Sequence, residues 1–320
     1  MNSKKIITAA ALLVACPLVL HAQAPPLTAP AAPTAPVSPT TPAASAVTLR
    51  YKFAVGQVHL YQYNTETDVM MQTGQTGAGI PISMTTQTTM RQTVKSIRPA
   101  DGAATIITQI GSVRALRNGQ EVPMSEEQQA KMKQPFTQVM LPNGEILSVK
   151  VAVSSAGTLG MDFSKGASGS LGSTVALPGG KTKIGDTWNT IGTVPGIGVD
   201  LTSKSVLASL DQKNGATLAT IQTTQTGIID KPLTVGMPMK MQGKVSGDMS
   251  QVFDMSEGAL QSMKGTMSAN MLMTSGTAAS GAAPGMPSAM KMQVQVKYTM
   301  ELLTGQSVVV PNGPAAAPAQ

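Results

Sequence analysis

The amino-acid sequence predicts a mainly β protein, a large antiparallel meander or half-barrel with one or two short helices, and three observations support this fold class. Polar and apolar residues alternate over long stretches, as in strands with one buried face. Asn-Gly, Asp-Gly and related pairs separate those stretches and favour tight turns. Charged residues make up only 12% of the chain, and its polarity comes from Thr, Ser, Gln and Gly, which suits sheets with neutral outer faces.

The first 22 residues are expected to be a secretory signal peptide. Lys4 and Lys5 precede an apolar stretch, residues 6–20, that is followed by small residues. That stretch is shorter than the roughly 20 apolar residues of a spanning helix, and no later segment is long or apolar enough. Cleavage after Ala22 is favoured over a cut two residues later, which would leave a proline beside the scissile bond. The mature chain is therefore expected to be extracytoplasmic, periplasmic or secreted, without a transmembrane span.

A lipoprotein signal is the alternative for the same segment. Leu13-Val14-Ala15-Cys16 has the spacing of a lipoprotein box, in which Cys16 would be acylated and would anchor an outer-membrane lipoprotein. Pro17 and the apolar residues after it argue against this alternative. Cys16 is the only cysteine, so its removal with the signal would leave a mature chain without disulfides.

The remaining chain divides by composition. Residues 23–47 are rich in Pro, Ala and Thr and predict a disordered spacer, and residues 305–320 predict a disordered tail. Residues 48–304 are left for an antiparallel β domain, which is large enough for one body or for two lobes. Val55-Gly56-Gln57 resembles Ile184-Gly185-Asp186, so the domain could consist of two duplicated halves, 48–153 and 177–304.

Three stretches show the alternation most clearly, and each is predicted to be a strand. In residues 290–300 the even-numbered positions are apolar or aromatic and the odd-numbered ones are Lys, Gln or Thr; residues 239–245 and 263–273 have the same period. The turn pairs between such stretches are Asp101-Gly102, Asn118-Gly119, Asn143-Gly144, Asn214-Gly215 and Glu257-Gly258. Because short turns join antiparallel neighbours, they predict a meander.

Helix is expected in two places only. In residues 125–134, Ser125 and Gln128 can form a capping box, acidic residues occupy the first turn, and Pro135 follows the last one. A second helix is expected near residues 161–171, where glycines weaken the signal.

Methionine is the unusual residue, with 22 copies at many apolar positions of the predicted strands. Packing in the core is the expected role. The alternative is a face that lines a site for an apolar ligand, because Met is flexible and polarisable. The methionines expected on that face are Met239, Met241, Met263, Met267, Met271, Met273, Met290, Met292 and Met300.

Composition and motifs argue against several other functions. The net charge of +7 is not clustered and aromatic residues are only 3%, so a nucleic-acid surface is not expected. His59 is the only histidine after the signal, and without other partners it does not predict a His-based triad or a His-rich metal site; a half-exposed strand residue is expected. Ser288 and Lys291 have S-x-x-K spacing without its companion motifs, and Glu66 and Asp68 share the solvated side of a strand. No enzymatic activity and no cofactor are expected.

Two segments resemble known proteins. Leu49-Arg50-Tyr51-Lys52-Phe53 with Gly56, and Gly185-Asp186-Thr187-Trp188, are similar to an uncharacterised family of secreted bacterial proteins with an LRYKF strand and a GDTW turn. The resemblance covers most of residues 48–304 and implies no activity. The fold as a whole is distantly similar to the half-barrel of bacterial lipoprotein carriers, which hold acyl chains, although a fold does not fix a function.

Three functional hypotheses follow. The first is an extracytoplasmic binding module for an apolar or lipid-like ligand. The second is a structural or envelope-interaction protein, lipid-anchored if Cys16 is acylated. The third is Cu(I) binding through methionines, because thioethers are soft ligands for this ion; Met239, Met241, Met271 and Met273 are the residues expected to take part.

Overall fold

The computed structural model describes residues 46–73, 79–151, 176–194, 199–234, 238–275 and 289–303. The predicted signal, the predicted spacer up to residue 45, the predicted tail from residue 305 onward and the predicted helix at 161–171 lie outside these residues. The described residues form two antiparallel sheets, of which the larger has twelve strands.

The large sheet runs in the order β7-β6-β4-β3-β2-β14-β13-β12-β11-β10-β9, with β5 added to β4. Its strands are β2 (Val58–Thr73), β3 (Ile80–Ile97), β4 (Ala104–Arg117), β5 (Gln120–Glu121), β6 (Phe136–Met140), β7 (Ile146–Val151), β9 (Thr187–Val194), β10 (Val199–Lys213), β11 (Ala216–Thr234), β12 (Pro238–Asp254), β13 (Ala259–Ser275) and β14 (Ala289–Leu302). The end strands β7 and β9 do not pair with each other, so the sheet stays open. The prediction of a mainly β, antiparallel half-barrel is confirmed.

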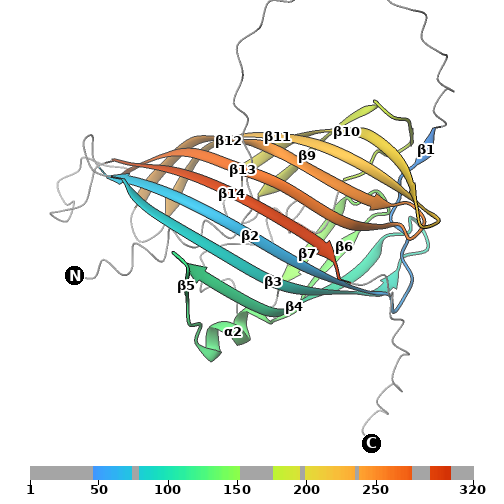
Figure 1. Cartoon of the computed structure of the whole chain (residues 1–320), viewed down its shortest axis with the longest axis horizontal. Coiled ribbons are helices and arrows are strands. Elements are labelled where there is room, and N and C mark those ends of the chain that lie inside the picture. The colour runs from blue at the N-terminus through green and yellow to red at the C-terminus, as the bar shows by residue number, and fades with distance from the viewer. Residues whose placement is uncertain are drawn as a thin grey trace, which may run out of the picture.

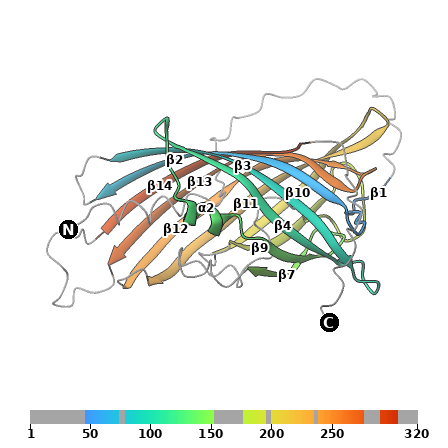
Figure 2. The ribbon, with the colours of Figure 1, turned by 90° about the horizontal axis from the view of Figure 1, so that it is seen from below.

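The large sheet is strongly curved. In Figure 1, β6, β7 and β9 lie behind β2, β13 and β14, and Figure 2 shows the long strands running from one end of the molecule to the other. Along the long strands, as in β14, alternate residues are buried and the residues between them are exposed. In a curved sheet the buried side is the inner one. We call this side the concave face.

The predicted turn pairs all connect antiparallel neighbours. Asp101-Gly102 joins β3 to β4, and Asn214-Gly215 joins β10 to β11. In each of the five pairs the glycine has a positive φ. At Asn214-Gly215 both residues do, with φ of 52° and 82°, as the tightest hairpin turns require. These turns let each strand return beside the preceding one.

One helix, α2 (Glu126–Met132), is present among the described residues, inside the predicted range 125–134. Its backbone bonds include Gln129 N to Ser125 O at 3.0 Å. Glu126 and Glu127 occupy its first turn, where acidic side chains favour the positive end of the helix dipole.

One end of the half-barrel is crossed by the small sheet, which consists of β1 (Val47–Thr48) and β8 (Lys181–Thr182). Residues after β1 are tied to the turns at this end. Tyr51 N donates to Pro142 O at 2.7 Å, and the Tyr51 ring packs edge-on against Phe253, with centroids 5.1 Å apart. Leu49 is fully buried. We call this the closed end, and the opposite one the distal end.

Similar turns precede β2 and β9. Gln57 and Asp186 each use a side-chain oxygen to accept a backbone N–H from three residues earlier, at 3.1 and 3.0 Å. Matching backbone bonds tie the first turn to β3 and the second to β10: Gly56 N to Val94 O, Val94 N to Gln57 O, Gly185 N to Leu207 O and Leu207 N to Asp186 O. The duplication into halves 48–153 and 177–304 stays a prediction. Both halves contribute strands to the one large sheet.

Candidate binding face

The concave face carries the methionines that the alternation predicted. On β14 the side chains of Met292, Val294, Val296, Tyr298 and Met300 are buried, whereas the odd-numbered residues between them are exposed. This pattern places every second residue of the strand on the concave face, as a period of two requires. The next strands continue it.

Strand register collects six of these methionines near the distal end. Residues directly opposite each other on neighbouring strands have Cβ atoms about 4.5–5.5 Å apart, so their side chains touch. One row runs across β2, β14 and β13, and the next row runs across β14, β13 and β12. The rows are Met71, Met292 and Met271, and then Met290, Met273 and Met241. We call these six residues the methionine cluster.

The cluster is buried to different degrees. The side chain of Met241 is fully buried, and Met71, Met271 and Met292 are buried as well, whereas Met273 and Met290 are half-buried. Of the other predicted positions, Met263, Met267 and Met300 lie buried on the same face, closer to the closed end. Met239 pairs with Ser275 at the distal end of β12, and the structure describes its backbone but not its side chain. Whether any of them contacts a ligand stays a prediction.

Met71 was missed by the sequence analysis, although a signal for it exists. Val69 and Met71 continue the alternation of β2 on the same side as Thr65 and Thr67, and all four are buried. Met70 beside it, with 37% of its surface exposed, breaks the alternating pattern and hides this short apolar run in the sequence.

A hydrogen-bonded polar group lies on the concave face of β10, β11 and β12. Ser205 Oγ and Thr223 Oγ1 are 2.8 Å apart, and Thr223 Oγ1 donates to Gln251 Oε1 at 3.4 Å. All three side chains are buried. Because a buried hydroxyl or amide is costly unless it is bonded, these residues stabilise one another within the sheet.

A second polar group lies on β4 and β6 and lacks such bonds. Thr108 and Gln138 are both buried, and among the described residues neither the Thr108 hydroxyl nor either amide atom of Gln138 has a hydrogen-bond partner. No sequence signal marks these two residues, because their significance depends on which strands become neighbours.

His59 lies on the concave face of β2 and is partly buried there. Its Nδ1 is 3.1 Å from the Tyr61 hydroxyl, and burial lowers the pKa of the imidazole. Burial also raises the pKa values of the Tyr61 and Tyr298 hydroxyls. These side chains are therefore uncharged near neutral pH, so this part of the face offers hydrogen bonds without charge.

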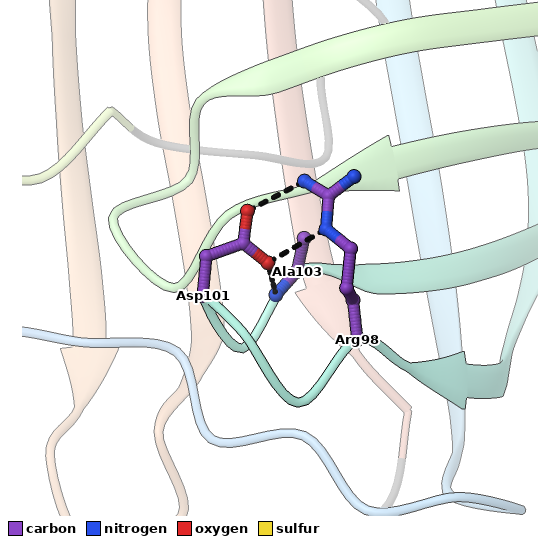
Figure 3. A network of polar contacts seen from close by, with 3 residues as sticks. All are labelled: Arg98, Asp101 and Ala103. Carbon is purple, nitrogen blue, oxygen red and sulfur yellow. Dashed lines mark hydrogen bonds and ion pairs between the residues drawn. The ribbon is translucent and has the colours of Figure 1, made fainter.

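Charged side chains stabilise the outside of the molecule instead. Figure 3 shows Arg98 and Asp101 in the turn between β3 and β4, where Arg98 Nε is 2.8 Å from Asp101 Oδ1 and the backbone of Ala103 donates to the same oxygen at 3.1 Å. The hydrogen bond from Arg98, reinforced by that of Ala103, lowers the pKa of the Asp101 carboxyl to about 2. Both side chains are exposed, so this network shapes a turn and forms no binding site.

The other site residues considered in the sequence analysis do not lie on the described part of the concave face. Glu66 and Asp68 are exposed, as predicted, and Glu66 lies 3.7 Å from the Lys297 ammonium on the outer side. Cys16 and Ser288 lie outside the described residues. Within the described ranges no three His, Cys, Asp or Glu residues come together as a metal site, and no helix is long and apolar enough to cross a membrane.

Comparison with known proteins identifies no family for this chain. No protein-family profile and no curated protein matches the chain, so the predicted resemblance to a secreted bacterial family stays a prediction. A search of solved structures finds weak likenesses. One is a structure on lipid–protein interactions in lipovitellin, with a TM-score of 0.45 and 11% identity over 84% of this chain; this chain spans only about a quarter (27%) of that one.

Two further structures are more distant. OmpF of Salmonella typhi in complex with daunomycin has a TM-score of 0.23, with 8% identity over 76% of this chain and 98% of OmpF. A domain described as an outer membrane lipoprotein-sorting protein from Vibrio parahaemolyticus has a TM-score of 0.14, with 13% identity over 77% of this chain and 86% of that domain. None of the three likenesses reaches a TM-score of 0.5.

Proposed function

We propose that this protein is an extracytoplasmic, non-enzymatic binding protein that holds an apolar or lipid-like ligand against the methionine cluster. The observation that carries the proposal is the register of β2, β14, β13 and β12, which places six thioethers in two adjoining rows on one face. The expected signal in residues 1–22 supports the location.

The chemistry of the cluster favours this class of ligand. Methionine side chains have three rotatable bonds and a polarisable sulfur, so they adapt to apolar molecules of varied shape. Each methylene of a ligand that leaves water contributes roughly 0.8 kcal/mol, so a long hydrocarbon chain gains several kcal/mol. Met273 and Met290, which are only half-buried, offer the surface at which such a chain would make contact.

Purified protein tests the proposal directly. Native mass spectrometry and solvent extraction should find a co-purifying lipid, and the protein stripped of lipid should bind the apolar dye N-phenyl-1-naphthylamine. Met273→Gln with Met290→Gln should weaken dye binding about tenfold, the change that a loss of about 1.4 kcal/mol produces.

The matched control exchanges exposed residues of the same two strands, Asn270→Gln with Lys291→Gln, and should leave dye binding unchanged. The proposal fails if neither lipid nor dye binds, or if the cluster variant and the control bind the dye equally well.

Cu(I) binding is a second candidate, favoured by one specific observation. Met241, Met273 and Met290 lie directly opposite one another on three neighbouring strands, and three thioethers at such spacing can converge on a soft ion. The set expected from the sequence shares Met241 and Met273 with this row; its other members are Met239, which pairs with Ser275, and Met271, which lies in the other row of the methionine cluster.

Competition with bicinchoninic acid under reducing conditions would measure the affinity for Cu(I). Replacing Met241, Met273 and Met290 by Leu should abolish binding, and replacing Met263, Met267 and Met300 by Leu on the same face should preserve it. Unchanged binding in the first variant would exclude the site.

A further inference from the structure

Apolar residues and lysines alternate across the outer side of five neighbouring strands near the distal end. From β11 to β2, one strand after another, they are Ile228, Lys244, Leu272, Lys291 and Met70. Ile228 lies directly opposite Lys244, and Leu272 lies directly opposite Lys291. The other two neighbouring pairs are one diagonal step apart, still within reach of long side chains. We call these five residues the outer band.

The outer band is open to solvent. Ile228 has 74% of its surface exposed, the highest value among the large apolar residues that the structure describes, and Met70 has 37%. Lys244 and Lys291 are exposed, and Leu272 is half-buried. One exposed apolar residue is ordinary on a protein surface, whereas several that gather in one place indicate a contact surface.

The distal end differs in this respect from the middle of the same strands. Ile80, which is 55% exposed, lies opposite Met71 and adds an apolar side chain to the concave side of this end. The end is therefore apolar on both sides of the sheet. Toward the closed end, the next three outward residues are polar on both outermost strands of the band: Thr226, Thr224 and Gln222 on β11, and Asp68, Glu66 and Asn64 on β2.

The charge around the outer band is positive. Lys240, at the distal end of β12, is 3.0 Å from Asp230. No carboxylate among the described residues pairs with Lys244 or Lys291. Asp200 lies to the side of the band, on β10. Three sequence segments connect these strands and β3 at this end without any Asp, Glu, Lys or Arg: 74–78, 235–237 and 276–288.

We infer that the outer band docks the distal end of the half-barrel onto a phospholipid membrane that contains anionic lipids. Ile228, Leu272 and Met70 enter the boundary between headgroups and acyl chains, where apolar side chains of interfacial proteins are buried. The hydrocarbon stems of the two lysines lie along this boundary, and their ammonium groups reach the lipid phosphates. Lysine is depleted in protein–protein interfaces, so the band suits a membrane better than a second copy of this chain.

Docking goes beyond the proposed function and needs no ligand on the methionine cluster. The cluster nevertheless lies on the other side of the same strand ends. A docked molecule therefore holds the cluster next to the membrane.

Flotation of the purified protein with lipid vesicles tests the inference. Phosphatidylcholine vesicles with roughly 30% phosphatidylglycerol should bind the protein at least tenfold more tightly than phosphatidylcholine alone, because each lysine contributes about fivefold near an anionic surface. About 0.5 M NaCl should remove most of this difference by screening. Ile228→Thr with Met70→Gln should weaken binding to the anionic vesicles about tenfold, and Lys244→Gln with Lys291→Gln should remove the preference for anionic lipid.

The matched controls replace exposed residues elsewhere. Ile184→Thr with Leu60→Gln changes two apolar residues of the closed end that are 43% and 41% exposed. Lys204→Gln with Lys264→Gln changes two exposed lysines outside the outer band. Both controls should bind vesicles as the native protein does. Ile228→Thr alone keeps the test available if the double variant does not fold.

The outcomes separate docking from the proposed function. Docking is wrong if neither kind of vesicle binds, or if band variants and controls lose binding to the same extent. It is also wrong if Ile228→Thr abolishes self-association in sedimentation instead of vesicle binding, since the band would then contact a second copy. The band variants should still bind N-phenyl-1-naphthylamine. Dye binding without vesicle binding refutes docking alone, and vesicle binding without dye binding refutes the proposed function alone.

Discussion

His59 is the one described imidazole, and its protonation is coupled to folding. Burial lowers its pKa below the ordinary value of 6.5, so the folded protein binds this proton less readily than the unfolded chain does. The resulting stability is fully present above pH 6.5. It is lost as the pH falls from 6.5 through the lowered pKa of the folded state.

We therefore expect acid to destabilise the native protein more than a variant without this group. Between pH 7.5 and pH 5, the free energy of unfolding in urea should fall further for the native protein than for His59→Gln. The carboxylates titrate in both proteins, so the difference isolates the imidazole. Equal falls would show that His59 is solvated in the folded state.

Gly265 shows how tightly the concave face is packed at one residue. It lies opposite Tyr298, and an added Cβ would collide with the Tyr298 ring and with the backbone oxygen of Asp248. The ring therefore packs directly over the backbone of β13.

Gly265→Ala should consequently cost about 1–3 kcal/mol of unfolding free energy, as other overpacked sites do. Gly180→Ala, where nothing lies within 4 Å of an added Cβ, should stay within about 0.5 kcal/mol. Denaturant unfolding compares the two, and equal stability of both variants would contradict the packing described.

At the level of elements, the hairpins depend on backbone conformations that few residues adopt. Gly215 has a φ of 82° between β10 and β11, where a Cβ is sterically unfavourable. Gly215→Ala should cost about 1–2 kcal/mol. Asn214→Gly should be nearly neutral at equilibrium, because glycine adopts the same φ without strain. Thermal unfolding of the two variants would measure this contrast, and a neutral Gly215→Ala would disprove it.

Local signals explain which elements were predictable. Asn118-Gly119 and Asn214-Gly215 mark hairpins through their own conformational preferences, and the alternation in residues 290–300 determines which side of β14 is buried. The prediction of α2 followed from its acidic first turn and the proline after it. Each of these signals acts over a few residues, so the sequence alone contains it.

Contacts between distant strands were not predictable in the same way. β2 pairs with β14, so Met71 meets Met292 across more than two hundred residues of chain. Neither periodicity nor turn chemistry selects that partner or its register. For this reason the sequence indicated a face that carries methionines, but it did not indicate which methionines share a row of the methionine cluster. Nor did it indicate which strands pair around Thr108 and Gln138.

For the whole molecule, ligand binding to the folded state should appear as stability. A ligand that binds only the folded protein adds about 2.7 kcal/mol at a concentration one hundred times its Kd. Protein stripped of lipid should therefore unfold at lower denaturant than protein supplied with dodecan-1-ol. The Met273→Gln, Met290→Gln variant should show a smaller difference, and an identical midpoint with and without the alcohol would exclude binding to the folded state.

The chain enters and leaves the half-barrel at the same end. Val47 lies in β1 at the closed end, and Leu303 N donates to Leu60 O, near the start of β2, at 2.7 Å. A tether attached directly at residue 46 or residue 303 would therefore hold the molecule from that end, about the length of β2 away from the methionine cluster. Such a tether should accordingly leave the distal end of the half-barrel directed away from the support, whether that support is a sensor chip or a membrane.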